Sequence, residues 1–158
     1  VEIPFEGSRY QLKKSGYFIT LEGTEGSGKS SLLKALAAHL VSEGYSVVTT
    51  REPGGTAEAE KIRNVVIENE VAPLTELLLY EASRAEHVQR KIMPELHAGK
   101  IVICDRFADS TLAYQGYGRR LDQKTIRVLN HIATSGLNPN LTFWLDLPVE
   151  IGLARASD

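Results

Sequence analysis

A glycine-rich segment near the N-terminal end constrains this chain more than any other feature of its sequence. Residues 23–30, Gly-Thr-Glu-Gly-Ser-Gly-Lys-Ser, match the pattern G-x-x-x-x-G-K-[ST] at every defined position. Glycines let the backbone wrap closely around a ligand, so that successive N–H groups point at phosphate oxygens. The pattern predicts a phosphate-binding loop in which Lys29 reaches the terminal phosphates and Ser30 holds Mg²⁺. A glycine-rich turn without a ligand is the alternative.

The segments on either side have the periodicities that such a loop requires. Tyr17–Glu22 is rich in β-branched and aromatic residues and is followed by Gly23, which predicts a buried strand. Between Lys29 and Glu43 leucine and alanine recur at helical spacing, and Gly44 supplies a stop signal. The loop therefore joins a predicted strand to a predicted helix.

Strands and helices alternate along the rest of the chain. Further strands are predicted at Tyr45–Thr50, Ile101–Cys104 and Leu141–Leu147, the last with Trp144 packed. This alternation predicts an α/β fold of the P-loop NTPase type, a three-layer sandwich with a parallel central sheet flanked by helices. In such sheets ligands bind at the carboxyl ends of the strands, and the polar, glycine-rich loops of this chain all fall there.

The predicted helices carry their apolar residues at helical spacing. One helix is expected at Glu58–Glu68, with Ile62, Val65 and Val66 facing inward. A longer helix is expected from Pro73 to His97, with a kink or break at Pro94 and with four inward residues, Leu77, Leu78, Ala82 and Ala85. Two more helices are predicted, one at Gln123–Thr134 and one that begins near Val149.

Length and composition restrict the remaining possibilities. The 158 residues suit one domain, and 18 Lys and Arg against 20 Asp and Glu argue against a nucleic-acid binder. A single cysteine, Cys104, excludes a disulfide framework and a cysteine-rich zinc site. Without an apolar run near the roughly 20 residues of a membrane span, or a signal-peptide core, the protein is expected in the cytoplasm.

Two regions are expected. Residues 1–16 lack a clear period, which predicts an N-terminal arm or tag-like extension, and the start at Val rather than Met suggests a processed, tagged or partial chain. Residues 17–158 form the predicted P-loop domain. The domain lacks the Asn-Lys-x-Asp element of GTP switches and is too short for a motor or transporter ATPase. A small phosphoryl-transfer enzyme with a second pocket for an acceptor is the class that remains.

Four sequence blocks identify a resemblance within this class. They are Leu21–Ser30, Thr50–Thr56 (Thr-Arg-Glu-Pro-Gly-Gly-Thr), Glu81–Arg84, and Cys104–Phe107 through Ser110–Gly116. In combination they resemble the thymidylate kinase family, whose members make dTDP from dTMP and ATP. The resemblance extends from about Tyr17 to Arg155. It implies a nucleoside-monophosphate kinase that uses Mg²⁺ with ATP as the phosphoryl donor.

The resemblance implies roles for residues on the phosphate side of the site. The ATP phosphates would lie in the loop Gly23, Thr24, Glu25, Gly26, Ser27, Gly28, Lys29 and Ser30. Glu25 would face the sugar 3′-hydroxyl of dTMP, and Gly26 stands where one subclass has an arginine, which implies the bacterial type with a lid arginine. Arg106 would grip the acceptor phosphate, assisted by Arg63, while Asp105 and Ser30 would hold Mg²⁺. The expected catalytic residues are Lys29, Asp105 and Arg106.

A second group of residues is implied for the dTMP base and sugar. Tyr80 would stack on thymine, Arg84 would donate to its O4, and Gln115 matches the N3–H and O4 edge. Tyr114 would lie near the sugar C2′. The resemblance also places Pro53, Ser110 and Thr111 along the same pocket. Two alternatives would give these residues no ligand: Tyr80 could be an aromatic residue of the core, and Asp105 and Arg106 could form a purely structural ion pair.

Other conspicuous residues are predicted to be structural. The four histidines, His39, His87, His97 and His131, have no paired ligand spacing and are expected at the surface or at helix ends. Cys104 is expected to be buried in a strand. Asp146 ends an apolar strand and is expected to be a structural capping residue. Arg155 stands near the start of the family's lid, where a role in binding ATP or phosphate is possible.

The resemblance also implies features outside this sequence. In the family the fold continues past the position of Asp158 with an arginine-bearing lid, a final strand and a closing helix, and members assemble as homodimers. The expected partners are therefore dTMP and ATP, with no nucleic acid and no membrane. Two alternatives stay open: a deoxynucleoside kinase on the same scaffold, and a nucleotide-binding module without turnover.

Overall fold

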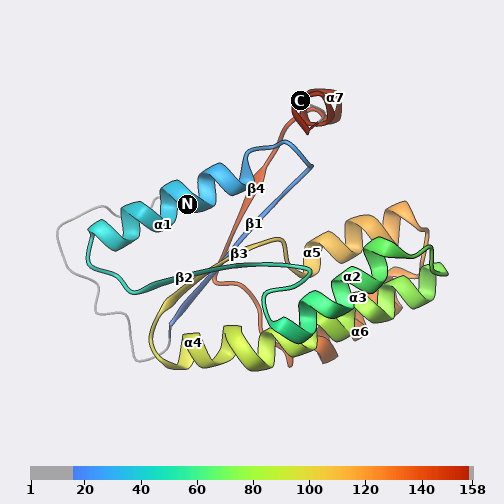
Figure 1. The fold of residues 1–158 in the computed structure, drawn as a ribbon, viewed down its shortest axis with the longest axis horizontal. Helices are drawn as coiled ribbons and strands as arrows, with labels where there is room; N and C mark the ends of the chain where they lie inside the picture. The colour runs from blue at the N-terminus through green and yellow to red at the C-terminus, as the bar shows by residue number, and fades with distance from the viewer. Residues whose placement is uncertain (1–15, 157–158) are drawn as a thin grey trace.

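Four parallel strands form the centre of the fold (Figure 1). The computed structural model describes residues 16–156, so the expected N-terminal arm lies outside the described residues except for Gly16. The strands are β1 (Tyr17–Gly23), β2 (Val47–Arg51), β3 (Ile101–Asp105) and β4 (Leu141–Leu145), in the order β2-β3-β1-β4. The predicted parallel sheet is confirmed, and all its carboxyl ends lie at one edge.

Alternating side chains of the two central strands bury both faces of the sheet. Phe18, Val102 and Cys104 point to one face, where they pack with Val88, Ile92 and Phe107. Ile19, Leu21, Ile101 and Ile103 point to the other face, where they pack under leucines of α1 (Lys29–Ser42). Strands buried on both faces need apolar residues at every position, which explains the unbroken apolar runs in the sequence.

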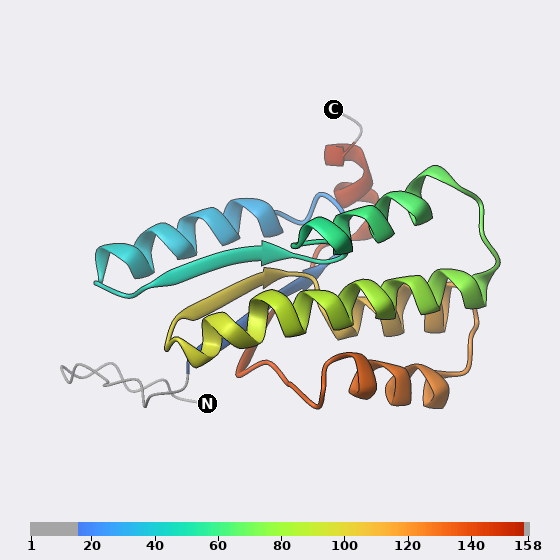
Figure 2. The same cartoon turned by 60° about the horizontal axis from the view of Figure 1, so that its bottom comes forward.

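One long helical segment covers the face opposite α1 (Figure 2). It consists of α3 (Pro73–His87), a π-helical turn η1 (Val88–Ile92) and α4 (Met93–His97). The expected helix from Pro73 to His97 is therefore present. Its irregularity lies in the turn before Pro94, because a π turn accommodates a disturbance of the hydrogen-bond ladder without ending the helix.

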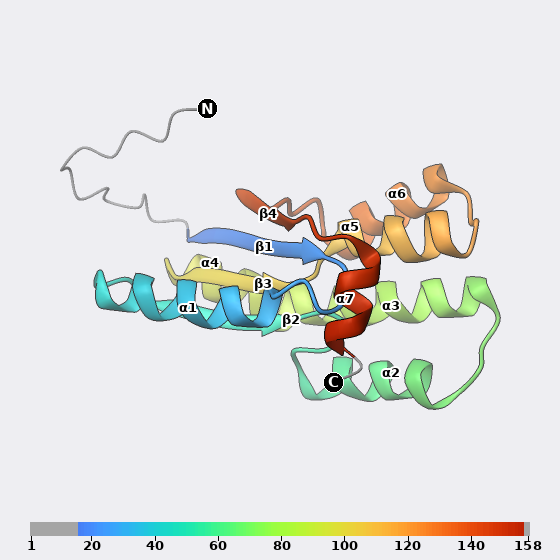
Figure 3. The same cartoon turned by 90° about the horizontal axis from the view of Figure 1, so that it is seen from above.

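The remaining helices extend past the carboxyl ends of the strands (Figure 3). Here α2 (Ala57–Glu68), α3 and α6 (Gln123–Ala133) lie side by side, with α5 (Ala108–Thr111) and the π-helical η2 (Leu112–Gly118) beside α6. The last helix, α7 (Val149–Ala156), lies across the same edge. Residues 108–118, for which the sequence suggested no element, therefore form a helical wall beyond the sheet.

Several residues expected to be packed are exposed. Trp144 is 73% exposed, because β4 is the edge strand of the sheet and its side chains are open on both faces. Val65 is also exposed, since Ala59 and Val66 supply the buried face of α2. Leu78 and Ala82 lie on the open side of α3, whereas Leu77 is buried. Within residues 16–156 no helix has both the length and the apolar character needed to cross a membrane.

Replacement of Phe18 by alanine tests this core. Phe18 is fully buried, and its ring meets that of Phe107 edge-to-face with centroids 5.0 Å apart. We expect Phe18→Ala to lower the free energy of unfolding by about 3–5 kcal/mol in urea denaturation. The control Val41→Ala, at an exposed position of α1, should stay within about 0.5 kcal/mol of the parent. A loss below about 1 kcal/mol for Phe18→Ala would contradict the described core.

Candidate active site

Three segments with functional residues continue directly from neighbouring strands. The phosphate loop follows β1, Glu52 follows β2 and Arg106 follows β3. Their backbones stay joined beyond the sheet, because the N–H of Glu52 donates to the carbonyl oxygen of Asp105 (2.9 Å) and the N–H of Arg106 to that of Leu21 (2.9 Å). The parallel sheet thus brings three separate parts of the sequence to one edge.

Lys29 lies folded against the phosphate loop. Its Nζ donates to the carbonyl oxygens of Thr24 (2.7 Å) and Gly23 (3.1 Å). Burial lowers the pKa of Lys29, and the nearby Arg106 guanidinium lowers it further. A buried ammonium beside the amides of the loop, at the N-terminal end of α1, makes this place favourable for an anion.

Helix α7 lies directly on the loop at two glycines. Gly26 has φ of 70°, and a Cβ atom there would collide with the carbonyl oxygen of Gly152. A Cβ on Gly152 would in turn collide with the carbonyl oxygen of Glu25. Any side chain at position 26, including the arginine of the other subclass, would therefore displace α7 from the loop.

The two predicted metal ligands lie together. Ser30 Oγ donates to Asp105 Oδ2 at 3.4 Å, and Asp105 Oδ1 is buried without a hydrogen-bond partner among the described residues. No group of three or more His, Cys, Asp or Glu side chains within residues 16–156 could hold a metal on its own. Mg²⁺ characteristically takes one or two protein oxygens and completes its shell with phosphates and water, so this pair fits it.

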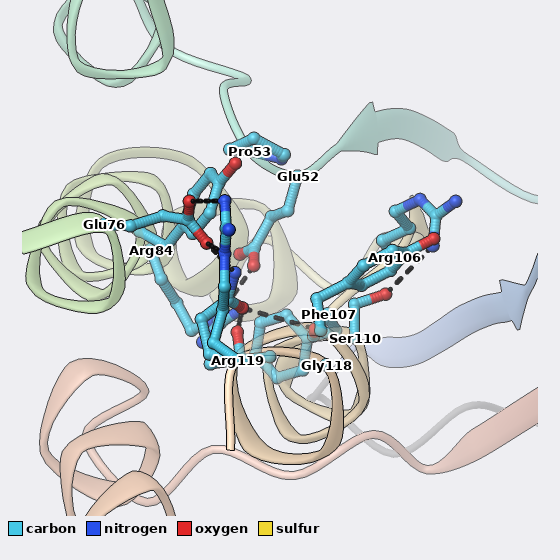
Figure 4. A pocket seen from close by; sticks show the side chains of 13 residues that line it. Glu52, Pro53, Glu76, Arg84, Arg106, Phe107, Ser110, Gly118 and Arg119 are labelled. Carbon is cyan, nitrogen blue, oxygen red and sulfur yellow. Dashed lines mark hydrogen bonds and ion pairs between the residues drawn. The ribbon is translucent and has the colours of Figure 1, made fainter. Parts of the chain in front are cut away.

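Arg106 lies between two cavities. It lines a cleft of about 530 Å³ on one side and a cavity of about 620 Å³ along the phosphate loop on the other. Its Nη1 donates to Ser110 Oγ (3.2 Å), and its guanidinium lies 5.3 Å from the centre of the Tyr114 ring. Figure 4 shows Arg106 and Ser110 together on one side of the cleft.

A buried carboxylate supports the segment around Arg106. Glu22 Oε1 accepts the N–H of Phe107 (2.8 Å), and Glu22 Oε2 accepts the hydroxyl of Ser110 (2.7 Å). Burial raises the pKa of Glu22 by more than these hydrogen bonds lower it. The end of β1 thereby fixes the residues that follow Arg106.

The cleft brings together most of the residues predicted to contact dTMP. Those that line it are Pro53, Tyr80, Arg84, Arg106, Ser110, Thr111, Tyr114 and Gln115. Lys29, Ser30, Asp105 and Arg106 line the cavity along the phosphate loop together with Glu25, Arg63 and Arg155. Arg63 Nε is buried without a partner among the described residues, so this guanidinium can still donate to a ligand.

Arg84 is held by protein groups on every side. Its Nε donates to Glu52 Oε2 (2.8 Å), its Nη1 to Glu81 Oε2 (3.1 Å) and Asn130 Oδ1 (2.6 Å). Its Nη2 donates to the carbonyl oxygen of Phe107 (3.2 Å) and to Thr111 Oγ1 (2.9 Å). A guanidinium has five N–H groups, so each of them already has an acceptor. A base oxygen at Arg84 would have to share one of these donors.

His87 lies at a helix end, one of the two positions expected for the histidines, but its ring is not solvated. It ends α3 and is fully buried, with Nδ1 3.0 Å from Glu52 Oε1 and Nε2 2.7 Å from Thr50 Oγ1. Gly55 lies so close to this ring that a Cβ atom would collide with it. The other three histidines, His39, His97 and His131, are exposed as expected, and Cys104 is buried with a raised pKa.

Glu76 and Arg119 lie at the opposite side of the cleft from Arg106 (Figure 4), and together with Gln115 they form a second linked group. Gln115 Nε2 donates to Glu76 Oε1 at 2.7 Å. Arg119 donates to both carboxylate oxygens, from Nη2 to Oε2 (2.8 Å) and from Nε to Oε1 (3.3 Å). Burial alone would raise the pKa of Glu76, but the hydrogen bonds from Arg119 and Gln115 outweigh burial and hold it below its ordinary value.

Sequence reasoning missed Glu22, Glu52, Glu76 and Arg119. The signal for Glu76 was available, because it precedes Tyr80 and Arg84 at a spacing of four residues on one helix face. Arg119 follows Gln115 by four residues, but no helix was expected there. Glu52 lies inside a block used for the resemblance without having been assigned a role.

Comparison with known proteins agrees with this geometry. The thymidylate kinase family model matches residues 21–158. A thymidylate kinase of Synechococcus sp. (strain JA-2-3B'a(2-13)) is 59% identical over 140 residues, which cover 88% of this chain and 68% of that protein. A thymidylate kinase of Geotalea uraniireducens is 54% identical over 146 residues, which cover 90% and 68% of the two chains.

A solved structure extends the similarity to three dimensions. The crystal structure of thymidylate kinase from Ehrlichia chaffeensis superposes with a TM-score of 0.81 at 44% sequence identity. The match covers 90% of this chain and 82% of that one. The match to the family model, the sequence identity and the shared P-loop fold together show that this chain belongs to the thymidylate kinase family.

Proposed function

We propose that this protein transfers the γ-phosphoryl group of ATP to dTMP and thereby makes dTDP. The observation that carries this proposal is the position of Arg106, which borders both the phosphate-loop cavity and the neighbouring cleft. An enzyme that joins two phosphorylated ligands needs a cation between them, because catalysis of phosphoryl transfer consists mainly of positioning and charge neutralisation. Membership of the family supports the same reaction.

The donor phosphates are assigned to the loop of residues 23–30. The buried Lys29 ammonium and the loop amides would bind the β- and γ-phosphates. Ser30 and the unpartnered Oδ1 of Asp105 would hold Mg²⁺. When bound, this ion neutralises charge on the phosphate oxygens.

The acceptor dTMP is assigned to the cleft. Its phosphate would lie against Arg106 and Arg63, whose guanidinium groups suit a phosphate because they can donate two parallel hydrogen bonds. Its base would lie beside Tyr80 and Gln115, and Glu25 would face the 3′-hydroxyl. In this arrangement a phosphate oxygen of dTMP attacks the γ-phosphorus in line, the bond from the γ-phosphorus to the β–γ bridging oxygen breaks, and ADP leaves. Lys29 and Arg106 neutralise the developing charge.

We also propose a homodimer that works in the cytoplasm. Helices α2, α3 and α6 carry exposed apolar side chains that a second copy of the chain would cover, namely Val65, Leu74, Leu78, Val128 and Ile132. The homodimer is implied by the family resemblance and is supported by these exposed side chains, whereas the cytoplasmic location is the expectation drawn from the sequence itself.

An acceptor panel tests the proposed reaction. ADP release in a coupled assay with ATP and Mg²⁺ should be fastest with dTMP, whereas a deoxynucleoside kinase would prefer thymidine. Lys29→Ala should reduce kcat by about 100-fold or more, because the transition state loses its buried cation. Lys124→Ala, at an exposed position of α6, should leave the rate unchanged. Preference for thymidine, or dTMP binding without dTDP formation, would contradict the proposal.

The substitution Arg106→Gln tests the contact with the acceptor phosphate. The dissociation constant of dTMP should rise about 10- to 100-fold, as expected for loss of a charge-assisted hydrogen bond worth about 1.5–3 kcal/mol. Thymidine has no phosphate, so its affinity should not change. Calorimetry with both ligands measures the two effects, and Arg127→Gln on the exposed side of α6 is the matched control. Equal weakening of both ligands would show that Arg106 does not contact the phosphate.

A further inference from the structure

The hydrogen bond between Glu76 and Gln115 fixes which end of the Gln115 amide faces the cleft. A carboxylate can only accept hydrogen bonds, so the group that lies 2.7 Å from Glu76 Oε1 must be the amide NH₂ of Gln115. In the reverse orientation two acceptor oxygens would face each other in a buried site. Both residues are less than a tenth exposed, so water could not relieve that repulsion.

Arg119 keeps Glu76 in its accepting form. Its two hydrogen bonds to the carboxylate neutralise the charge, and the pKa of Glu76 stays below the ordinary value despite burial. Arg119 is itself about half exposed, so it carries little desolvation cost of its own. Glu76 can therefore stay ionised and oriented at the wall of the cleft.

We propose that Glu76, supported by Arg119, is a positioning residue for base selectivity: it turns the Gln115 carbonyl oxygen toward the ligand as an acceptor for a pyrimidine N3–H. This inference rests on the proposed function, in which the cleft holds dTMP. Thymine and uracil carry a hydrogen on N3, whereas N3 of cytosine is an acceptor. A fixed acceptor at Gln115 admits the first two bases and leaves cytosine facing an oxygen with no hydrogen between them.

The substitution Glu76→Gln should reverse this orientation. The substituted amide can accept from Arg119 with only one of its two groups. Arg119 bonds Oε2 at 2.8 Å and Oε1 at 3.3 Å, so the carbonyl oxygen would take the Oε2 position and the longer bond from Arg119 Nε would be lost. Its NH₂ would then occupy the Oε1 position and face Gln115, which must turn its own carbonyl oxygen inward to accept. The NH₂ of Gln115 would then face the cleft and could donate to N3 of cytosine.

Equilibrium binding of dTMP, dUMP and dCMP tests this mechanism. Calorimetry on the parent protein and on Glu76→Gln should show that the preference for dTMP over dCMP narrows about tenfold or more. The ratio of the dissociation constants of dTMP and dUMP should stay the same, because thymine and uracil share the N3–H edge. Glu86→Gln, which changes another α3 carboxylate that pairs with the exposed Arg90, should leave both ratios unchanged.

The selectivity ratio separates positioning from a merely structural contact. If Glu76 only connects α3 to η2, Glu76→Gln weakens the binding of dTMP and the binding of dCMP by the same factor, and the proposal is overturned. If Glu76→Gln does not fold, the double variant Glu76→Gln/Arg119→Gln removes both charges of the pair, and it should also narrow the dTMP-to-dCMP ratio. A parent protein that binds no dTMP would refute the proposed function itself, a result distinct from an unchanged ratio.

Discussion

Arg84 must be paired on all sides because it is buried beneath the cleft, and this requirement organises the region beyond the sheet. Its hydrogen bonds reach Glu52 after β2, Glu81 on its own helix, Asn130 on α6, and the segment from Phe107 to Thr111. Removing one acceptor would leave a charge or a donor unsatisfied in a dry site, which costs far more than the bond contributes. The network therefore defines one arrangement of the cleft walls.

The two sides of the site contain different sets of contacts. On the sheet side, Glu22 holds the segment that follows Arg106, and Asp105 meets Ser30 at the phosphate loop. On the helix side, Glu76 accepts hydrogen bonds from both Gln115 and Arg119. In the proposed function the strand ends therefore bind the phosphates, while α3 and η2 bind the base. Both depend on acidic residues that contact other protein groups rather than the proposed ligands.

The sequence was most informative where a pattern has a single physical cause. The phosphate loop and the apolar strands were predictable, because phosphate binding requires glycine turns and a doubly covered sheet requires apolar runs. Which side chains of α2 are buried, and whether Trp144 is exposed, could not be predicted, because this depends on which elements lie beside them. The burial of His87 and the pairing of Arg84 depend on distant partners such as Glu52, which is 35 and 32 positions away from them, and periodicity does not reveal such contacts.

A crystal structure with dTMP, Mg²⁺ and a non-hydrolysable ATP analogue would examine the proposed arrangement directly. We expect a phosphate oxygen of dTMP about 3–3.5 Å from the γ-phosphorus and in line with the bond that breaks. Arg106 should contact the dTMP phosphate, and the thymine ring should lie in the cleft beside Tyr80 and Gln115. A dTMP phosphate turned away from residues 23–30, or a base bound outside the cleft, would contradict this account.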